Sequence, residues 1–527
     1  MENENRVAQL EAEIAALKSE NAKLKLLNDC YLEQLRLARH RQFGRSSEKT
    51  ELPDQLGLFN EAEVLADEPL EKEKIGPYTR KKRNGKREKF YEGLPTEQIV
   101  HELPEDERIC PDCGGLLHAC GHQVLRREVK IIPAQVSAVE HIQTVYGCRK
   151  CERVAADAPV PMIKAPVPPP VIPGSGIASP SLLSFIISNK YVLALPLARQ
   201  EKELERIGVH ISRQTLANWV IFAGNRYLEP IYKLLYKELL GNEIIHSDES
   251  GLQVIKEDGR KASQKSWMWM YHTGRDAEKH IALFEYQATR EGKHPRAFLD
   301  GFRGFLHVDA YSGYKALEGA GVTLVECWSH MRRKFEEALK ALKKQDRKNA
   351  KANIGLEYCN QIFALEREFD EQKLNFAQRK AEREQKSKPV CEAFFAWAKK
   401  ESDDGVLAKN SLNTALTYAI NQEPWLTNFL LDGRLEVSNN RAERSIRPFT
   451  VGRKNWLFSF SPKGAKASAI AYSIAESAQA NGLVPFLYLN YLFDKLPGLP
   501  PERYRECLPW VNDVREACGI PNVSGKV

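Results

Sequence analysis

Hydrophobic positions recur in a heptad pattern at the start of the chain. Positions three and four residues apart alternate over the first 35 residues, and the members of the pattern are Val7, Leu10, Ile14, Leu17, Asn21, Leu24, Asn28, Tyr31 and Leu35. This spacing predicts a coiled coil over residues 1–45 and, through it, a homodimer or higher oligomer. Asn21 and Asn28 fall at the a-type position, where a buried amide favours a defined register. The alternative is a single amphipathic helix packed on its own protein.

From residue 243 onward the pattern changes to short runs typical of β-strands. Five runs are predicted as strands, and they are residues 243–254, 266–271, 279–286, 304–309 and 322–328. A helical pattern around residues 295–300 separates the third run from the fourth, and a basic helical segment at 329–342 follows the fifth. The resulting order, β-β-β-α-β-α-β-α, is that of a ribonuclease-H-like fold, so the predicted fold class is α/β.

Three carboxylates lie within or at the ends of these predicted elements. Asp248 lies in the first run, Asp309 ends the fourth, and Glu443 lies at the start of a later helical pattern. Two hard cations about 4 Å apart can activate an attacking oxygen and stabilise a leaving one, and carboxylates supply the ligands for both. The three residues therefore predict a catalytic site with two Mg²⁺ or Mn²⁺ ions. The alternatives are strand-end or turn roles for the aspartates, and a capping box of Asn440 with Glu443.

Several runs resemble the transposases of insertion sequence family sixty-six. They are residues 246–254, 308–314, 327–335 and 438–444 continuing through 454–458, and the similarity covers nearly the whole chain. The resemblance implies a DDE recombinase in which Asp248, Asp309 and Glu443 match the metal-binding triad. It also implies that Cys327 and His330 match the family's Cys-x-x-His signature, which makes them accessory candidates at the catalytic site.

The stretch between Asp309 and Glu443 is far too long for one strand and one helix. The excess, residues 336–428, is rich in Ala, Leu, Lys, Glu and Arg and has no strong strand pattern. It predicts a helical insertion that divides the core into residues 241–335 and 429–480. The charge of the insertion is either a solvated surface or a surface that also touches DNA.

Cysteine usage is uneven, because five of the 11 cysteines fall between residues 110 and 151. Four of them form two Cys-x-x-Cys pairs, which are Cys110 with Cys113 and Cys148 with Cys151. This spacing predicts a zinc ribbon over residues 106–158 that holds one structural Zn²⁺. Disulfides are the alternative, which a cytoplasmic chain disfavours. Cys120 and two nearby histidines could substitute as ligands, but a ribbon with four cysteines needs none of them.

The remaining segments predict linkers and DNA contacts. Residues 46–105 form a charged linker with a basic tract, residues 159–178 a proline-rich linker, and residues 179–240 a helical, helix-turn-helix-like region. The DNA-binding candidates are basic or amide side chains, namely Arg80, Lys81, Lys82 and Arg83 of the tract, Arg213, Gln214 and Asn218 of the second helix, and Arg332 and Arg333 after the fifth strand. Ser212 is the expected N-cap of that second helix.

Three arginines close to Glu443 are further accessory candidates. They are Arg441, Arg444 and Arg447, whose guanidinium groups could neutralise phosphates while the glutamate holds metal. The alternative is that they pair with nearby acids. Residues 481–527 resemble the family's C-terminal element, whose chemistry the sequence does not reveal.

Composition agrees with a large protein of several domains. The chain has 527 residues, 43% of them hydrophobic, and no apolar run reaches the roughly 18 residues of a membrane span. Its N-terminus lacks the apolar core of a signal peptide, so a cytoplasmic, nucleoid-associated bacterial protein is expected. The net charge of +7 is weak support for nucleic-acid binding, because 70 acidic residues accompany the 77 basic ones.

The first functional hypothesis is a DDE transposase that binds the terminal inverted repeats of its element, cleaves DNA and joins the 3′-hydroxyl to target DNA. Its partners would be double-stranded DNA, a second copy of the chain and accessory proteins of the same element. The alternative from a different class is a dimeric zinc-containing DNA-binding regulator with an unused recombinase fold. A metal-dependent nuclease without joining activity is a related alternative.

Overall fold

The computed structural model describes residues 2–43, 136–147, 162–319, 321–403 and 410–520. The chain divides into two compact units, one made of residues 1–70 and 169–519 and the other of residues 71–168 and 520–527. In the second unit, β1 (Val145–Gly147) and β2 (Met162–Lys164) pair antiparallel. Two sets of predicted site residues lie outside the described residues: the ribbon cysteines Cys110, Cys113, Cys148 and Cys151, and the tract residues Arg80, Lys81, Lys82 and Arg83.

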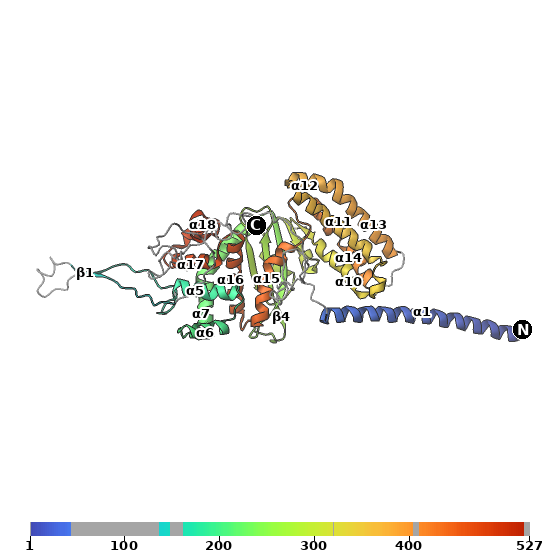
Figure 1. The fold of residues 1–527 in the computed structure, drawn as a ribbon, viewed down its shortest axis with the longest axis horizontal. Helices are drawn as coiled ribbons and strands as arrows, with labels where there is room; N and C mark the ends of the chain where they lie inside the picture. Colours follow the sequence, from blue (N-terminus) through green and yellow to red (C-terminus); the bar gives the residue numbers. More distant parts are fainter. Residues whose placement is uncertain (1, 44–135, 148–161, 320, 404–409, 521–527) are drawn as a thin grey trace, which may run out of the picture. The chain divides into compact units, whose positions relative to one another are not determined.

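The N-terminal heptads form one long helix, α1 (Glu2–Phe43) (Figure 1). Five described heptad residues are between 50% and 58% exposed in the single chain, and they are Ile14, Leu17, Leu24, Tyr31 and Leu35. On another part of the helix Cys30 is buried, and the Arg36 guanidinium donates to the Ala341 carbonyl at 3.4 Å. The helix therefore touches its own chain away from the heptad seam, and the seam residues whose side chains are described stay uncovered.

A five-stranded mixed sheet lies at the centre of the larger unit, and its strands follow the runs predicted from the sequence (Figure 1). They are β3 (Ile244–Gln253), β4 (Lys265–Thr273), β5 (Ala282–Gln287), β6 (Gly304–Val308) and β7 (Val322–Glu326). Their order in the sheet is β5-β4-β3-β6-β7. The first three strands form an antiparallel meander, whereas β6 pairs parallel with β3, and β7 parallel with β6. Residues far apart in the chain thus end adjacent strands.

The connections around β6 differ in part from the predicted order. Helix α9 (Lys293–Phe298) precedes β6 as expected, but a 3-10 helix, η3 (Ser312–Leu317), replaces the α-helix predicted between β6 and β7. The connection is short, and Gly319 and Gly321 have φ values of 88° and 87°. These left-handed conformations, which glycine tolerates best, turn the chain directly into β7 and leave no room for longer helical turns.

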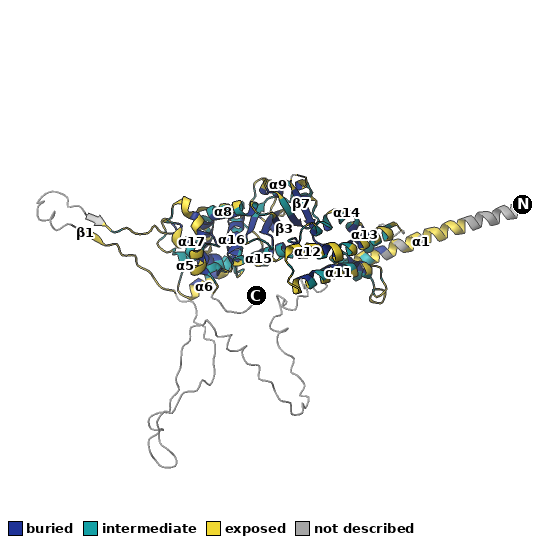
Figure 2. Cartoon of the chain, turned by 90° about the horizontal axis from the view of Figure 1, so that it is seen from above, coloured by how far each residue is buried: buried dark blue, intermediate teal, exposed yellow. Residues whose placement is uncertain are grey.

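Helices from both ends of the larger unit share one hydrophobic core with the sheet (Figure 2). Those before the sheet are α5 (Pro180–Tyr191), α6 (Leu197–Arg206), α7 (Arg213–Ala223) and α8 (Glu229–Leu240), and those after the insertion are α15 (Asn440–Trp456), α16 (Pro462–Ala480), α17 (Pro485–Lys495) and α18 (Asn512–Cys518). The Ser477 and Ser473 hydroxyls of α16 accept hydrogen bonds from the amides of Ala282 and Phe284 at 3.0 and 2.7 Å. Because β5 is an edge strand, α16 satisfies amides that no further strand pairs with.

The segment predicted as a helical insertion consists of helices, and these have a core of their own. They are α11 (Ala352–Glu371), α12 (Phe376–Glu382), α13 (Lys388–Asp403) and α14 (Ser411–Leu426), which follow α10 (Trp328–Ala341). Trp328 lies in this second core, and its indole N–H donates to the Leu426 carbonyl at 2.8 Å. The first residue of α10 therefore ties the insertion to the end of β7.

A buried ion cluster also holds the insertion to the chain that returns toward α15. The Glu366 carboxylate accepts hydrogen bonds from Arg379 and Arg383 at 2.7 to 2.8 Å, and both guanidinium groups are almost fully buried. Arg383 also donates to the carbonyls of Phe429, Asp432 and Leu435. One buried arginine thus fixes the backbone of the segment that leads into α15.

Within the described ranges, every helix is too short or too polar to traverse a lipid bilayer.

Candidate functional site

Asp248 lies in β3, and Asp309 directly follows β6, the parallel strand beside it. In the pairing of β3 with β6, His246 is opposite His307, and each aspartate lies two residues further along its strand direction. Asp309 directly follows Val308, the last residue of β6. The two aspartates, which are distant in sequence, are therefore brought to one place at the sheet, as the sequence predicts.

The start of α15, the helix that carries Glu443, lies beside β3, because Asn439 Nδ2 donates to the Ser247 carbonyl. Burial raises the pKa of Asp248 well above its usual range, and the carboxylates of Glu249, Asp309 and Glu443 raise it further. A group of carboxylates that disfavour one another's charge is stabilised by a cation, and hard oxygen donors suit Mg²⁺ or Mn²⁺. The acids from β3, from the end of β6 and from α15 could therefore hold hard divalent ions.

Glu443 is positioned by helix α15, whose apolar residues recur at helical spacing. The buried positions are Ala442, Ile446, Phe449 and Gly452, and with them α15 packs against β3 and β4. Glu443 lies in the first turn, after the N-cap residue Asn439. Asn440 is not the N-cap, and Asn439 makes no side-chain capping bond. The capping-box interpretation of Asn440 and Glu443 is therefore wrong.

Asn439 instead joins three elements through buried hydrogen bonds. Its Oδ1 lies 3.0 Å from His246 Nδ1, and its Nδ2 donates to the Ser247 carbonyl at 2.8 Å, so both bonds reach β3 beside Asp248. Its backbone N–H donates to Cys327 Sγ at 3.1 Å. The side chain of Asn439 thus sets the start of α15 against the strand that carries Asp248, and its backbone N–H sets it against the residue that precedes α10.

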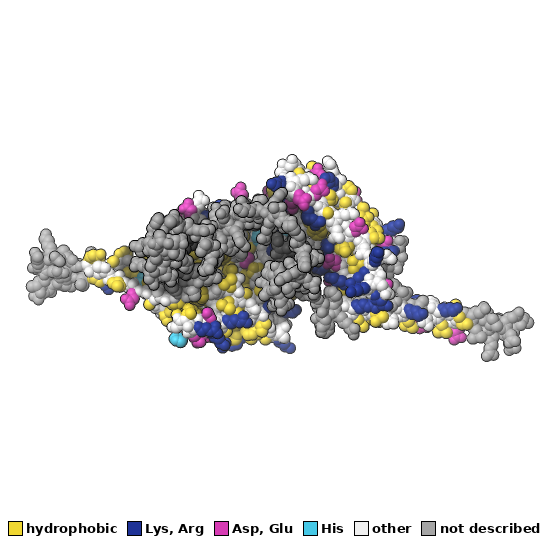
Figure 3. Space-filling view, viewed as in Figure 1, with side chains coloured by type: hydrophobic (Ala, Val, Ile, Leu, Met, Phe, Trp, Pro, Cys, Tyr) yellow, Lys and Arg dark blue, Asp and Glu magenta, His cyan; other side chains and the backbone are white. Residues whose placement is uncertain are grey.

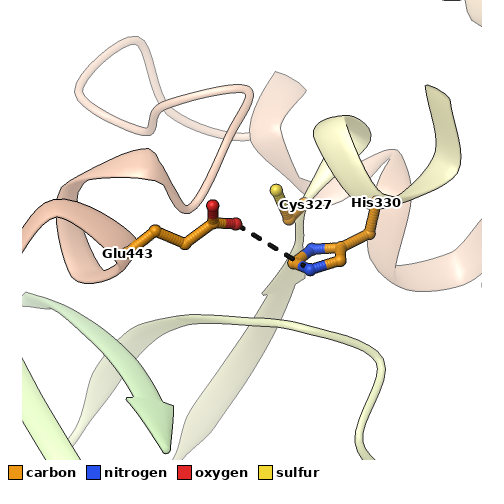
Figure 4. Close-up of side chains that lie close together, drawn as sticks. All are labelled: Cys327, His330 and Glu443. Atoms are coloured by element: carbon orange, nitrogen blue, oxygen red, sulfur yellow. Dashed lines mark ion pairs between the residues drawn. The ribbon is translucent and has the colours of Figure 1, made fainter. Parts of the chain in front are cut away.

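Figure 4 shows Cys327, His330 and Glu443 turned toward one another. Their potential metal-binding atoms all lie within 4.8 Å of one another, and His330 Nε2 is 3.8 Å from Glu443 Oε1. Burial alone would lower the pKa of His330, but its interactions with Cys327 and Glu443 raise that pKa to about 9. Asp248 and Asp309 are not part of this cluster. The Glu443 side chain therefore faces His330, although its charge is felt at Asp248.

A second buried group lies beneath the aspartates. The rings of His246 and His307 stack at 4.7 Å, and His246 Nε2 lies 3.2 Å from the carboxylate of Glu436. Burial alone would raise the pKa of Glu436, but its bonds to His246 and Arg441 lower it well below the usual range. Arg441 Nε donates to Glu436 at 2.9 Å, so its guanidinium is engaged inside the protein. Among the three predicted arginines, Arg444 is exposed and Arg447 half-buried.

The predicted DNA-binding residues lie in two described places. Ser212 caps α7 as predicted and accepts from the Thr215 amide at 3.2 Å, after Gly208 turns the chain with a φ of 85°. Three residues of α7 are exposed, and they are Arg213, Gln214 and Asn218. Figure 3 shows Lys and Arg side chains gathered near α6, where Arg199, Lys202 and Arg206 are exposed.

The two arginines predicted to contact DNA at the start of α10 differ in their surroundings. Arg332 forms an ion pair with Glu336 and donates to Asn360 Oδ1 at 2.8 Å, whereas Arg333 is exposed. Because a paired guanidinium must give up its partner to bind a phosphate, Arg333 is the better placed of the two for a DNA contact.

Two carboxylates near the aspartates escaped the sequence analysis. Glu249 is almost fully buried and accepts from Arg290 Nε at 2.8 Å and from the Tyr314 hydroxyl at 2.6 Å. Glu326 ends β7, opposite Val308 in the pairing with β6. Burial raises the pKa of Glu326 to about 8, and Asp309 contributes to the increase. The position of Glu326 at the end of a predicted strand was the available signal, because parallel strands end at one edge of a sheet.

Comparison with known families gives four matches along the chain. The model of the transposase IS66 family matches residues 175–467, which is more than half of the chain and includes Asp248, Asp309, Cys327, His330 and Glu443. The zinc-finger binding domain of transposase IS66 matches residues 107–152, and the IS66 C-terminal element matches residues 473–510. A model described as transposase C of IS166 homeodomain matches residues 31–99, which the sequence analysis interprets mostly as a linker.

The chain is also similar to proteins of Sinorhizobium fredii. It is 28% identical to uncharacterized protein y4hP over 494 residues, which cover 89% of this chain and 86% of that protein. It is 28% identical to uncharacterized protein y4qI over 532 residues, which cover 96% of this chain and 93% of that protein. The similarity to both extends over nearly their whole length.

Proposed function

Because the chain belongs to the IS66 transposase family, we propose that it binds the terminal inverted repeats of an insertion sequence and catalyses metal-dependent DNA strand cleavage and strand transfer. The observation that carries the proposal is geometric: Asp248 lies in β3, Asp309 follows the neighbouring parallel strand β6, and Asn439, at the start of the helix that carries Glu443, bonds to β3 beside Asp248. We also assign the core to the ribonuclease-H-like class, and the strand order β5-β4-β3-β6-β7 supports this. The protein would act on DNA of the bacterial nucleoid, in the cytoplasm.

The three carboxylates would hold two Mg²⁺ or Mn²⁺ ions, which supply charge neutralisation for in-line displacement at phosphorus. The protein's own part is to position groups. Asp248 and Asp309 are held level by the pairing of β3 with β6, and Asn439 sets the start of α15 beside them. The exposed guanidinium of Arg444 follows Glu443 directly and is free to contact a phosphate of the strand being cut. No covalent protein intermediate is required.

Purified full-length protein with oligonucleotides that carry the ends of the element tests the proposal. We expect strand nicking and joining to target DNA in the presence of Mg²⁺ or Mn²⁺, and neither without a divalent ion. Binding to the ends without any cleavage would identify a zinc-containing DNA-binding regulator instead. Cleavage without joining would identify a nuclease. If the protein alone cleaves but does not join, the assay is repeated with accessory proteins of the same element.

Asn439→Ala is expected to slow strand cleavage roughly 10- to 100-fold, the range typical of residues that orient metal ligands. The change leaves His246 Nδ1 and the Ser247 carbonyl without their partner, so stability should also fall by about 1–3 kcal/mol. If the role is positioning, the Mg²⁺ concentration for half-maximal cleavage should rise. Asn455→Ala, which removes an exposed bond at the far end of α15, is the control. A normal Mg²⁺ dependence in Asn439→Ala would show a purely structural role.

The uncovered heptad seam of α1 supports a dimer formed through a coiled coil. Replacing Leu17 and Leu24 together by glutamate should place like charges in the seam and yield a monomer, because buried unpaired charge is costly. The control is Ala16→Glu with Lys23→Glu, which changes charge on the same helix outside the seam. Sedimentation equilibrium of the full chain measures the mass. An unchanged mass in the seam variant would exclude this dimer.

We propose that the two Cys-x-x-Cys pairs hold one structural Zn²⁺, and the match of residues 107–152 to a zinc-finger domain supports this. Replacing Cys110 and Cys113 together by serine should remove one zinc ion per chain and weaken binding to the element's ends. Cys120→Ser, a neighbouring cysteine outside the pairs, should keep the metal. Loss of zinc from Cys120→Ser would overturn the assignment, and elemental analysis of the purified variants decides it.

A further inference from the structure

Cys327, His330 and Glu443 offer a set of donors that differs in kind from the neighbouring carboxylates. A thiolate, an imidazole and one carboxylate are the ligands of Zn²⁺, whereas Mg²⁺ prefers oxygen ligands alone. The three potential donor atoms lie within 4.8 Å of one another. Among the described residues, no other group of three or more Cys, His, Asp or Glu side chains has its potential donor atoms this close together.

The three side chains come from the starts of two helices, α10 and α15. Cys327 is the N-cap residue of α10, and His330 follows one turn later, so both project from the start of the same helix. The backbone N–H of Asn439 donates to Cys327 Sγ at 3.1 Å, which fixes the sulfur beside the start of α15. Asn439 is also the N-cap of α15, which brings Glu443 to the other side. One backbone contact therefore links both halves of the cluster.

Two buried polar atoms in the cluster have no hydrogen-bond partner among the described residues. They are Nδ1 of His330 and Oε1 of Glu443, and the latter is 3.8 Å from His330 Nε2, which is too long for a hydrogen bond. Buried polar groups are otherwise nearly always satisfied, so a facing pair of this kind needs an explanation. A cation bound between the carboxylate and the imidazole would explain both atoms, and it would also explain why the Cys327 sulfur lies beside them.

We propose that Cys327, His330 and Glu443 bind one Zn²⁺ ion, and that this ion withholds Glu443 from Asp248 and Asp309. The first half rests on the geometry of the cluster, whereas the second rests on the proposed function. Because Glu443 has one carboxylate to share, a zinc ion here competes with the hard ions needed for strand cleavage. With zinc bound at this site, the catalytic centre would be inactive, because Glu443 could not bind the ions needed for strand cleavage.

The geometry needs only a small adjustment to bind the ion. With Zn–S near 2.3 Å and Zn–N and Zn–O near 2.1 Å, tetrahedral donors stand about 3.5 Å apart. The observed 3.8 Å between His330 and Glu443 is close to this value, and the limit of 4.8 Å for the other pairs leaves about 1 Å to close. Side-chain rotation of Glu443 can supply it, since its carboxylate is one-third exposed.

Zinc binding by the full-length chain tests the first half directly. At submicromolar free Zn²⁺, Cys327→Ser and His330→Gln should each hold one zinc ion per chain fewer than the wild type. The controls Cys359→Ser, a buried cysteine of the insertion, and His280→Gln, a partly buried histidine elsewhere, should match the wild type. The ribbon cysteines are the same in every variant, so any ribbon zinc cancels in the comparison. Equal zinc content in all five proteins would overturn the site.

A spectroscopic measurement separates a metal site from a hydrogen-bonded cluster. With Co²⁺ in place of Zn²⁺, the thiolate-to-metal absorption per chain should be weaker in Cys327→Ser than in Cys359→Ser. An unchanged spectrum would mean that the cysteine is no ligand. If Cys327→Ser does not fold, His330→Gln tests the same ion through its zinc content, because the His330 side chain is one-quarter exposed and tolerates polar replacement.

Inhibition of strand cleavage tests the second half. Zinc added to a Mg²⁺-supported reaction should inhibit the wild type at a concentration at least about tenfold lower than it inhibits His330→Gln, each measured against its own zinc-free rate, because loss of a ligand weakens the ion. Equal inhibition would overturn the competition for Glu443 while the zinc count still decides the site. Absence of cleavage in every zinc-free protein would refute the proposed function and leave the binding result intact.

Discussion

Replacement of Asp248, Asp309 or Glu443 by its amide should slow Mg²⁺-dependent strand cleavage by more than about 100-fold. Changes in residues that merely support metal ligands already cost about 10- to 100-fold, so loss of a ligand must exceed that range. The amide keeps the shape of the side chain and removes its charge. Single-turnover cleavage of an oligonucleotide that carries one end of the element measures the effect, and a gel-shift assay should show nearly unchanged DNA binding.

The same variants separate a catalytic role from a structural one. Burial and the neighbouring carboxylates raise the pKa of Asp248 well above its usual range, so removing its charge should not lower stability in metal-free buffer. Asp300→Asn, which changes an exposed aspartate outside the cluster, is the control for both measurements. Cleavage at the wild-type rate in any of the three variants would remove that residue from the proposed triad.

Glu366→Ala should destabilise the protein by about 3–5 kcal/mol, the cost of leaving buried charge without its partner. Glu366 is the carboxylate that both Arg379 and Arg383 bind, and these guanidinium groups are 1% and 0% exposed. Arg383 also holds the carbonyls of the segment that leads into α15, so the active site should loosen together with the insertion. Denaturant unfolding measures the loss of stability.

Glu368→Ala is the matched control, because Glu368 lies on the same helix and pairs with Lys386 in solvent. Exposed pairs contribute little, so this variant should unfold close to the wild type. Equal stability of the two variants would mean that the buried cluster relaxes when its acid is lost. Replacing Glu366, Arg379 and Arg383 together by apolar residues removes all three charges of the cluster and should recover part of the stability, although the carbonyls of Phe429, Asp432 and Leu435 then lose their donor.

Local sequence patterns predicted the strands well. The runs at residues 304–309 and 322–328 contain β6 and β7, because alternation and β-branched residues report directly on a pleated, buried segment. Asp248 and Asp309 could be singled out for the same reason, since each stands at a recognisable place along a strand. The α-helix predicted between these strands was wrong, because the conformation of Gly319 and Gly321 depends on where the next strand must start.

The sequence by itself determined the five strands, their order along the chain, the excess helical segment and the residue types able to bind metal, because these follow from spacing and composition along the chain. Only the tertiary structure decided which side chains meet. No role was predicted for Asn439 from the sequence, yet it bonds to β3 and Cys327, and Glu443 faces His330 from a different helix. Such meetings depend on how elements far apart in the chain pack together, and local periodicity carries no record of that packing.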